Sequence, residues 1–142
     1  MRQGWRVKLS PETFIYRKTK MLKKEKIFYI AMTVLIALEI FLFSNISTPI
    51  GENLGFSLAT LYHFAVFFMF TFFLSLALIN KRLDNKKIWI ILLISLAYAL
   101  SDEFHQLFVP GRFSSLKDVI IDLIGSALAV LTVKILEKFK KI

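Results

Sequence analysis

The chain has 142 residues, 56% of them hydrophobic, yet it carries 19 Lys and Arg residues and a formal net charge of +9. This length allows one domain at most, and the composition excludes an ordinary soluble protein, since it fits apolar residues in lipid and basic residues at the membrane surface. The absence of cysteine excludes disulfides, thiolate metal sites and cysteine nucleophiles.

Residues 1–26 form a basic leader that holds nine Lys and Arg residues. Ser10 followed by Pro11 indicates a helix start, and the mixture of apolar and basic residues after it predicts a short interfacial helix on an anionic leaflet. A nucleic-acid partner is the poorer interpretation, because a membrane anchor with its basic side inward requires the same residues. We therefore predict no nucleic-acid binding.

Four apolar runs follow, each close to the roughly 20 helical residues that cross a bilayer. We predict transmembrane helices at residues 27–46, 57–79, 88–109 and 119–136. The first run is not a cleaved signal peptide, because a long basic leader precedes it, Glu39 interrupts it and no small-residue cleavage site follows it. The sequence thus predicts an all-α membrane protein with a four-helix domain at 27–136 and a basic cytoplasmic tail at 137–142.

The basic residues predict the orientation. Seventeen of the 19 Lys and Arg residues fall in the leader, the second loop or the C-terminal end, and two fall in the third loop. The positive-inside rule then places both termini in the cytoplasm. We expect a multi-pass protein of the cell membrane.

Ionisable side chains occur in all four predicted spans, although each costs about 2.5–3.5 kcal/mol on insertion scales and usually needs a partner. At 1.5 Å per residue, Glu39, His63, Asp102 and Asp122 lie roughly 18 to 24 Å from the cytoplasmic end of their spans. Four helices would therefore place titratable groups in one layer of the outer half of the membrane. We expect these groups to face the bundle interior or a cavity open to the outside.

The densest polar stretch ends the third span, at residues 101–106. Helical spacing puts Asp102, His105 and Gln106 on one face, with Glu103 on its margin, so that Asp102 and His105 are i, i+3 neighbours. We assign these two residues as a hypothetical acid/base pair. Pro110-Gly111-Arg112 then turns the chain outside the membrane. The residues expected to contribute to binding are Glu39, His63, Glu103, Gln106, Arg112, Ser115, Asp118 and Asp122.

Several of these residues have a structural alternative. Ser115 and Asp118 have the spacing of a capping box at the start of the fourth helix. Arg112 could bind lipid head groups as an interfacial arginine, and Glu39 could pair with His63 for stability alone. Gly125 and Ala129 form a small-xxx-small pair, which predicts helix packing rather than a site.

The residues from 102 to 125 also resemble the VanZ-like family. The resemblance rests on Asp102-Glu103-Phe104-His105-Gln106, Pro110-Gly111-Arg112, Ser115, Asp118, Asp122 and Gly125, with His63 and the patch Phe43-Ser44-Asn45 as further matches. The family takes its name from a protein associated with teicoplanin resistance, and the resemblance implies a membrane protein rather than one particular reaction. One departure stands out, because Asp122 occupies a position where the family usually has Asn. The resemblance therefore implies a hydrogen-bond acceptor at this position.

Three classes of function fit these residues. The first is a protein that binds or modulates a lipid, an envelope component or a glycopeptide-type ligand at the outer leaflet. The second is an intramembrane acid/base enzyme acting on a lipid-linked envelope substrate. The third is a small ion-coupled transporter, but the cytoplasmic half of the spans lacks the charged residues that an ion path would need. The carboxylates and histidine could also ligate a divalent metal. However, no spacing such as H-E-x-x-H is present, so we assign no metal ligand and no cofactor.

Overall fold

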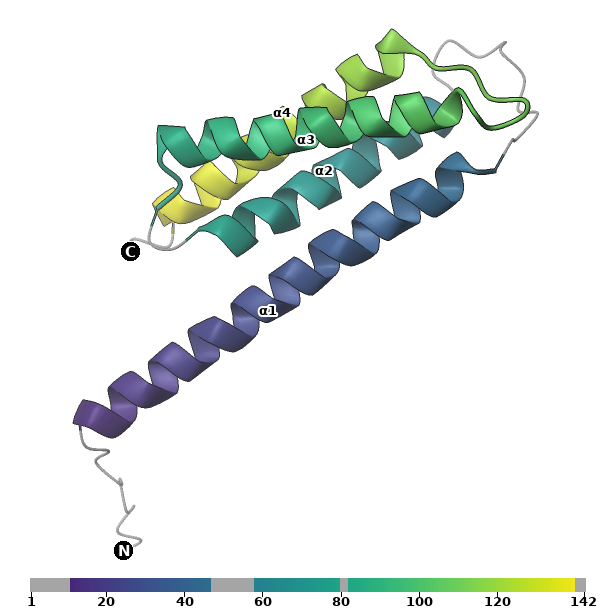
Figure 1. Cartoon of the computed structure of the whole chain (residues 1–142). Coiled ribbons are helices and arrows are strands. Elements are labelled where there is room, and N and C mark those ends of the chain that lie inside the picture. The colour runs from purple at the N-terminus through teal and green to yellow at the C-terminus, as the bar shows by residue number, and fades with distance from the viewer. Residues whose placement is uncertain (1–10, 47–57, 80–81, 140–142) are drawn as a thin grey trace, which may run out of the picture.

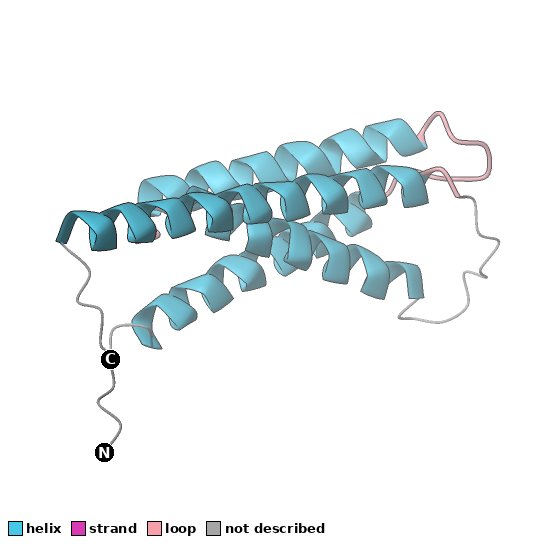
Figure 2. Cartoon of the chain, turned by 90° about the horizontal axis from the view of Figure 1, so that it is seen from below, coloured by secondary structure: helices cyan, strands magenta, loops and turns pink. Residues whose placement is uncertain are grey.

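The computed structural model describes residues 11–46, 58–79 and 82–139, with side chains from residue 23 onward. It contains four helices, α1 (Pro11–Ser44), α2 (Leu58–Leu78), α3 (Asn85–Gln106) and α4 (Leu116–Phe139), and the regular elements of this part of the chain are all helical. Figures 1 and 2 show them lying roughly lengthwise against one another as a bundle. Each helix contains a stretch long and apolar enough to cross a membrane. The predicted fold class is confirmed.

The helix boundaries agree with the predicted spans to within about a turn, apart from the start of α1. The third helix begins earlier than predicted, because the Asp84 carboxylate caps it by accepting a hydrogen bond from the Lys87 backbone N–H at 2.9 Å. It also ends earlier, since the apolar residues Leu107 to Val109 lie in a turn. The basic leader is helical from Pro11, as predicted, but it continues without a break into the first span (Figure 1).

Close packing of α2 against α4 is the most extensive contact in the bundle. A Cβ atom placed on Gly125 would lie 2.5 Å from the carbonyl oxygen of Phe64 and 3.2 Å from the backbone nitrogen of Phe68. Ala129, one turn further along α4, is fully buried. The small-xxx-small pair therefore serves helix packing, as predicted.

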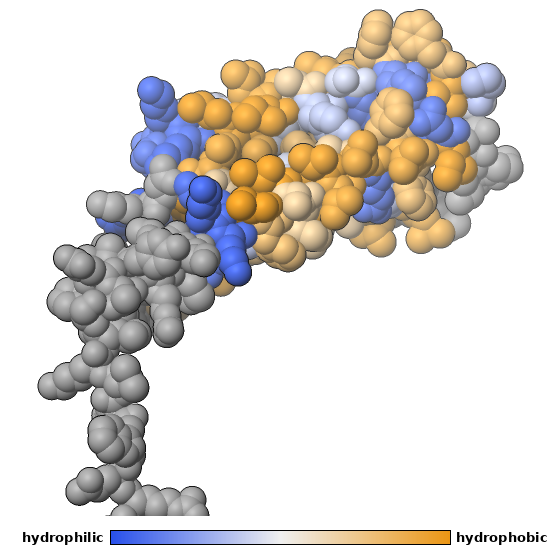
Figure 3. Space-filling model, turned by 60° about the horizontal axis from the view of Figure 1, so that its bottom comes forward, coloured by the Kyte–Doolittle hydropathy of each residue, from blue (hydrophilic) through white to orange (hydrophobic). Residues whose placement is uncertain are grey.

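The outer surface of the bundle is strongly apolar. Many large side chains are more than half exposed, among them Phe113 at 83%, Trp89 at 72% and Leu58 at 71%. On the face shown in Figure 3, hydrophobic residues cover the middle of the molecule and hydrophilic residues gather toward its two ends. This distribution suits a lipid environment, because the exposed apolar side chains can contact acyl chains there instead of water.

The interior contains a hydroxyl cluster that was not predicted from the sequence, formed by Thr71, Ser95 and Ser126. Thr71 Oγ1 lies 2.8 Å from Ser95 Oγ and donates to Ser126 Oγ at 2.9 Å, which links α2 to α3 and α4. All three side chains are fully buried. Small hydroxyl residues of this kind let membrane helices approach closely and hydrogen-bond across their interface.

Replacing Thr71 with valine should remove these two interhelical hydrogen bonds while keeping the side-chain volume. We expect a loss of about 0.6–1.7 kcal/mol in the free energy of unfolding, the range measured for such bonds in membrane bundles. Unfolding by SDS titration in mixed micelles measures this difference. Thr132→Val is the control, because Thr132 Oγ1 donates to the Leu128 carbonyl of its own helix; an equal loss in both variants would contradict an interhelical role for Thr71.

Candidate functional site

Buried polar side chains gather at one end of the bundle, where α1 and α3 finish and α2 and α4 begin. The opposite end holds the first residues of α3 and the last residues of α2 and α4. Each residue of the buried polar set is at most 6% exposed, and all four helices contribute to the set. The set consists of Ser44, His63, Asp102, Glu103, Gln106 and Asp122.

Asp102 on α3 joins this helix to α1. The hydroxyl of Ser44 donates a hydrogen bond to its Oδ1 atom, and the side-chain amide of Gln106 donates to its Oδ2 atom at 2.9 Å. Helical spacing predicted that Gln106 shares the face of Asp102, and this contact confirms it. Each oxygen of Asp102 therefore accepts one hydrogen bond, and these two bonds fix the position of the buried carboxylate.

His63 on α2 and Asp122 on α4 form a buried pair. The His63 Nδ1 atom lies 3.2 Å from Asp122 Oδ1, and the other Asp122 oxygen is buried without a hydrogen-bond partner. The alternative pairing of His63 with Glu39 is not seen. Glu39 lies instead on the exposed side of α1, contrary to the expectation that it faces the bundle interior.

Glu103 connects the end of α3 to the start of α4. Its Oε2 atom accepts a hydrogen bond from the Ser115 backbone N–H at 2.6 Å, whereas its Oε1 atom is buried without a partner. A carboxylate there also stabilises the positive end of the α4 dipole. The capping box predicted from Ser115 and Asp118 is absent from the described hydrogen bonds, because Glu103 takes the Ser115 N–H that the Asp118 carboxylate would have accepted.

His105 lies apart from the buried set and is only half-buried. Its Nε2 atom is 3.1 Å from Asn45 Oδ1, and its ring packs on Phe41 with centroids 4.6 Å apart. No hydrogen bond or ion pair joins His105 to Asp102, although the structure describes both residues. The two oxygens of Asp102 accept hydrogen bonds from Ser44 and Gln106 instead. The two residues predicted to form an acid/base pair thus contact different partners and not each other.

Two pockets open beside these residues. One, of about 280 Å³, is lined mainly by aromatic residues of α1 and α3 and includes Asp102 and His105. The other, of about 200 Å³, lies between the end of α1, the start of α2 and the turn after α3. The second pocket is lined by Phe43, Ile46, Leu58, Ala59, Tyr62, His63 and Arg112.

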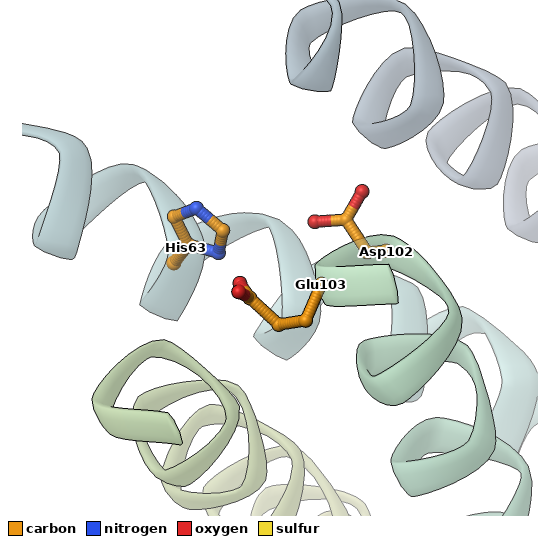
Figure 4. Close-up of side chains that lie close together, drawn as sticks. All are labelled: His63, Asp102 and Glu103. Atoms are coloured by element: carbon orange, nitrogen blue, oxygen red, sulfur yellow. The ribbon is translucent and has the colours of Figure 1, made fainter. Parts of the chain in front are cut away.

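The buried residues between the pockets bring possible ligand atoms together. One nitrogen of His63, one oxygen of Asp102 and one oxygen of Glu103 lie within 4.8 Å of one another. Figure 4 shows the Glu103 carboxylate extending from α3 toward the imidazole, with Asp102 beside it. His63 lies 39 and 40 positions before Asp102 and Glu103 in the sequence, which is why no local spacing revealed the cluster.

A family model described as VanZ/LLP1 matches residues 1–137. The chain belongs to the VanZ/LLP1 family. The resemblance of residues 102–125 to the VanZ-like family is thereby confirmed, and the match extends over the leader and all four helices of this VanZ/LLP1 membrane protein. A search of curated proteins and a search of solved structures found no match.

In this VanZ/LLP1 protein, the polar residues predicted to converge do so only in part. His63, Asp102, Glu103, Gln106 and Asp122 are buried together, whereas Asp118, Ser115 and Arg112 are partly exposed at the rim. Ser44 and Asn45 were not predicted as partners of Asp102 and His105. Their only signal was a polar patch at the end of the first span.

Proposed function

We propose that this VanZ/LLP1 protein binds the anionic head group of an amphiphilic molecule, either a lipid or a lipid-linked envelope component. The pocket that contains Arg112 and His63 is the proposed site. Arg112 carries the proposal, because it lines this pocket and forms no ion pair with a carboxylate among the described residues.

The guanidinium of Arg112 has donors to spare. Its Nη2 atom donates to the Phe43 carbonyl oxygen at 3.1 Å, and its Nε–H is buried without an acceptor. Arginine carries five N–H donors in a planar fork that matches a phosphate or carboxylate. An anionic head group would provide acceptors for the Arg112 donors, which no carboxylate among the described residues engages.

The remaining wall of the pocket suits the apolar part of such a ligand. Phe43, Ile46, Leu58 and Tyr62 line it, and the exposed side chains on the same helices continue as an apolar surface toward the middle of the bundle. An acyl chain could therefore remain in the lipid phase while its head group contacts Arg112. Because the positive-inside rule predicts cytoplasmic termini, we place this pocket at the outer leaflet of the cell membrane.

Lipid titration with native mass spectrometry of the detergent-purified full chain tests this proposal. We expect phosphatidylglycerol to bind more tightly than neutral phosphatidylcholine. Arg112→Gln should weaken phosphatidylglycerol binding about ten-fold, equivalent to about 1.4 kcal/mol, which is close to the lower end of the range for a hydrogen bond to a charged group. Arg112→Lys should bind with intermediate affinity, since it keeps the charge and loses the planar fork.

The matched control is Arg82→Gln. Arg82 is an exposed arginine at the opposite end of the bundle, so its removal changes the net charge equally without touching the pocket. Equal weakening by the two glutamine variants would indicate a general charge effect and refute the pocket. Equal retention of the two lipids by the unmodified protein would refute the proposal as a whole.

A further inference from the structure

The buried carboxylates of the candidate site outnumber the basic groups that contact them. Asp102, Glu103 and Asp122 are all at least 94% buried, and among the residues that the structure describes the only basic side chain paired with any of them is His63. No Lys or Arg in the described part of the chain forms an ion pair with these three residues. Buried carboxylates without a compensating charge are costly in a membrane bundle, so this arrangement favours a bound cation.

An unsatisfied oxygen of Glu103 indicates where the cation would bind, and a second unsatisfied oxygen lies on Asp122, which contacts the same histidine. Glu103 Oε1 and Asp122 Oδ2 are buried and have no hydrogen-bond partner, although buried polar atoms are nearly always satisfied. The Glu103 carboxylate is directed toward His63 (Figure 4). The other carboxylate, that of Asp122, contacts the same imidazole, because its Oδ1 atom lies 3.2 Å from His63 Nδ1. Both unsatisfied oxygens thus belong to carboxylates that face His63.

We propose that His63, Asp102 and Glu103 bind a divalent transition-metal ion such as Zn²⁺ or Mn²⁺. Their ligand atoms lie within 4.8 Å of one another, and atoms bound to one such ion at about 2.0–2.2 Å are roughly 3–4 Å apart. Small side-chain rotations therefore close the site. One imidazole with two carboxylates is a donor set that these ions accept.

The surrounding residues complete the proposed site. Asp122 contacts the His63 imidazole and orients it, as carboxylates commonly do for metal-bound histidines. Ser44 and Gln106 hold Asp102 through its two oxygens, and the Ser115 N–H holds Glu103. The metal would lie between the two pockets, because His63 lines one of them and Asp102 the other.

Manganese titration followed by electron paramagnetic resonance tests this site directly. The full chain, purified in a neutral detergent and stripped with EDTA, should take up about one Mn²⁺ per molecule in a saturable manner. Asp102→Asn and Glu103→Gln should each weaken uptake by at least about ten-fold. Glu25→Gln is the control. It removes an exposed carboxylate in the N-terminal half of α1, far from the proposed site, and should leave Mn²⁺ uptake unchanged.

Pulsed electron paramagnetic resonance of the Mn²⁺-loaded protein distinguishes the two histidines of the chain. A ¹⁴N signal from a coordinated imidazole should persist in His105→Gln and disappear in His63→Gln. Absence of saturable Mn²⁺ uptake by the unmodified chain, uptake unaffected by both carboxylate variants, or a ¹⁴N signal that depends on His105 would each overturn the proposal. Arg112→Gln should bind Mn²⁺ normally, so that a failure of the metal site and a failure of head-group binding are separate results.

Discussion

Replacing His63 with leucine is expected to destabilise the bundle by about 3–5 kcal/mol, the cost of leaving one member of a buried ion pair without its partner. Asp122 is fully buried, and its only hydrogen-bond partner among the described residues is His63. Leucine fills much of the space of the imidazole but offers no donor. Unfolding by SDS titration in mixed micelles, with EDTA present to exclude any metal contribution, measures the change.

The double variant His63→Leu with Asp122→Leu separates loss of the pair from loss of volume. Removing both members should recover most of the stability, because replacing a buried pair by apolar residues is often neutral or favourable. His105→Leu is the matched control, since His105 is half-buried and has a neutral partner in Asn45. A cost for His63→Leu no greater than that for His105→Leu would contradict a buried, energetically important pair.

The second large effect is expected at Gly125, where alanine should destabilise the bundle by about 1–3 kcal/mol through overpacking. The added Cβ would meet backbone atoms of α2, the nearest at 2.5 Å, and backbone cannot move aside as a side chain can. The helices must separate instead. This clash outweighs the gain of up to about 1 kcal/mol that alanine has over glycine within a helix.

The same unfolding assay measures Gly125→Ala. Ala127→Ser also adds one heavy atom to α4, but on its exposed side, and should change the stability little. A stabilised Gly125→Ala variant would mean that α2 and α4 are not in close contact at this position.

The fold could be predicted because each element carries its own signal. The apolar runs predict the spans, whereas the cap at Asp84, also a local signal, was not used, and the third span was therefore predicted to begin three residues late. Gln106 could be assigned to Asp102 because the two are one helical turn apart. In each case the interacting residues belong to one segment, so the periodicity of the helix suffices.

The site could be predicted only in part, because its contacts depend on how the helices are rotated against one another. Depth along the span predicted that Glu39 belongs to the polar layer. The buried face of α1, however, consists of Ile36, Ile40 and Ser44. Glu39 is rotated by about 100° around the helix axis from Ile40, so its side chain is exposed. The contact of Ser44 with Asp102 joins residues 58 positions apart. No periodicity in either segment specifies that register.

The attachment of α1 has a mechanical consequence. The hydrogen bonds described for this helix and the residue after it, to Tyr98, Asp102, His105 and Arg112, all involve residues 37–45, whereas its middle packs through rings such as Phe28 against Phe73. With 34 residues, α1 extends about 45 Å from this attachment to its first turn. A tilt of about 5° around the attachment would displace that turn by about 4 Å, so small shifts at residues 37–45 would be amplified at the N-terminal end of α1.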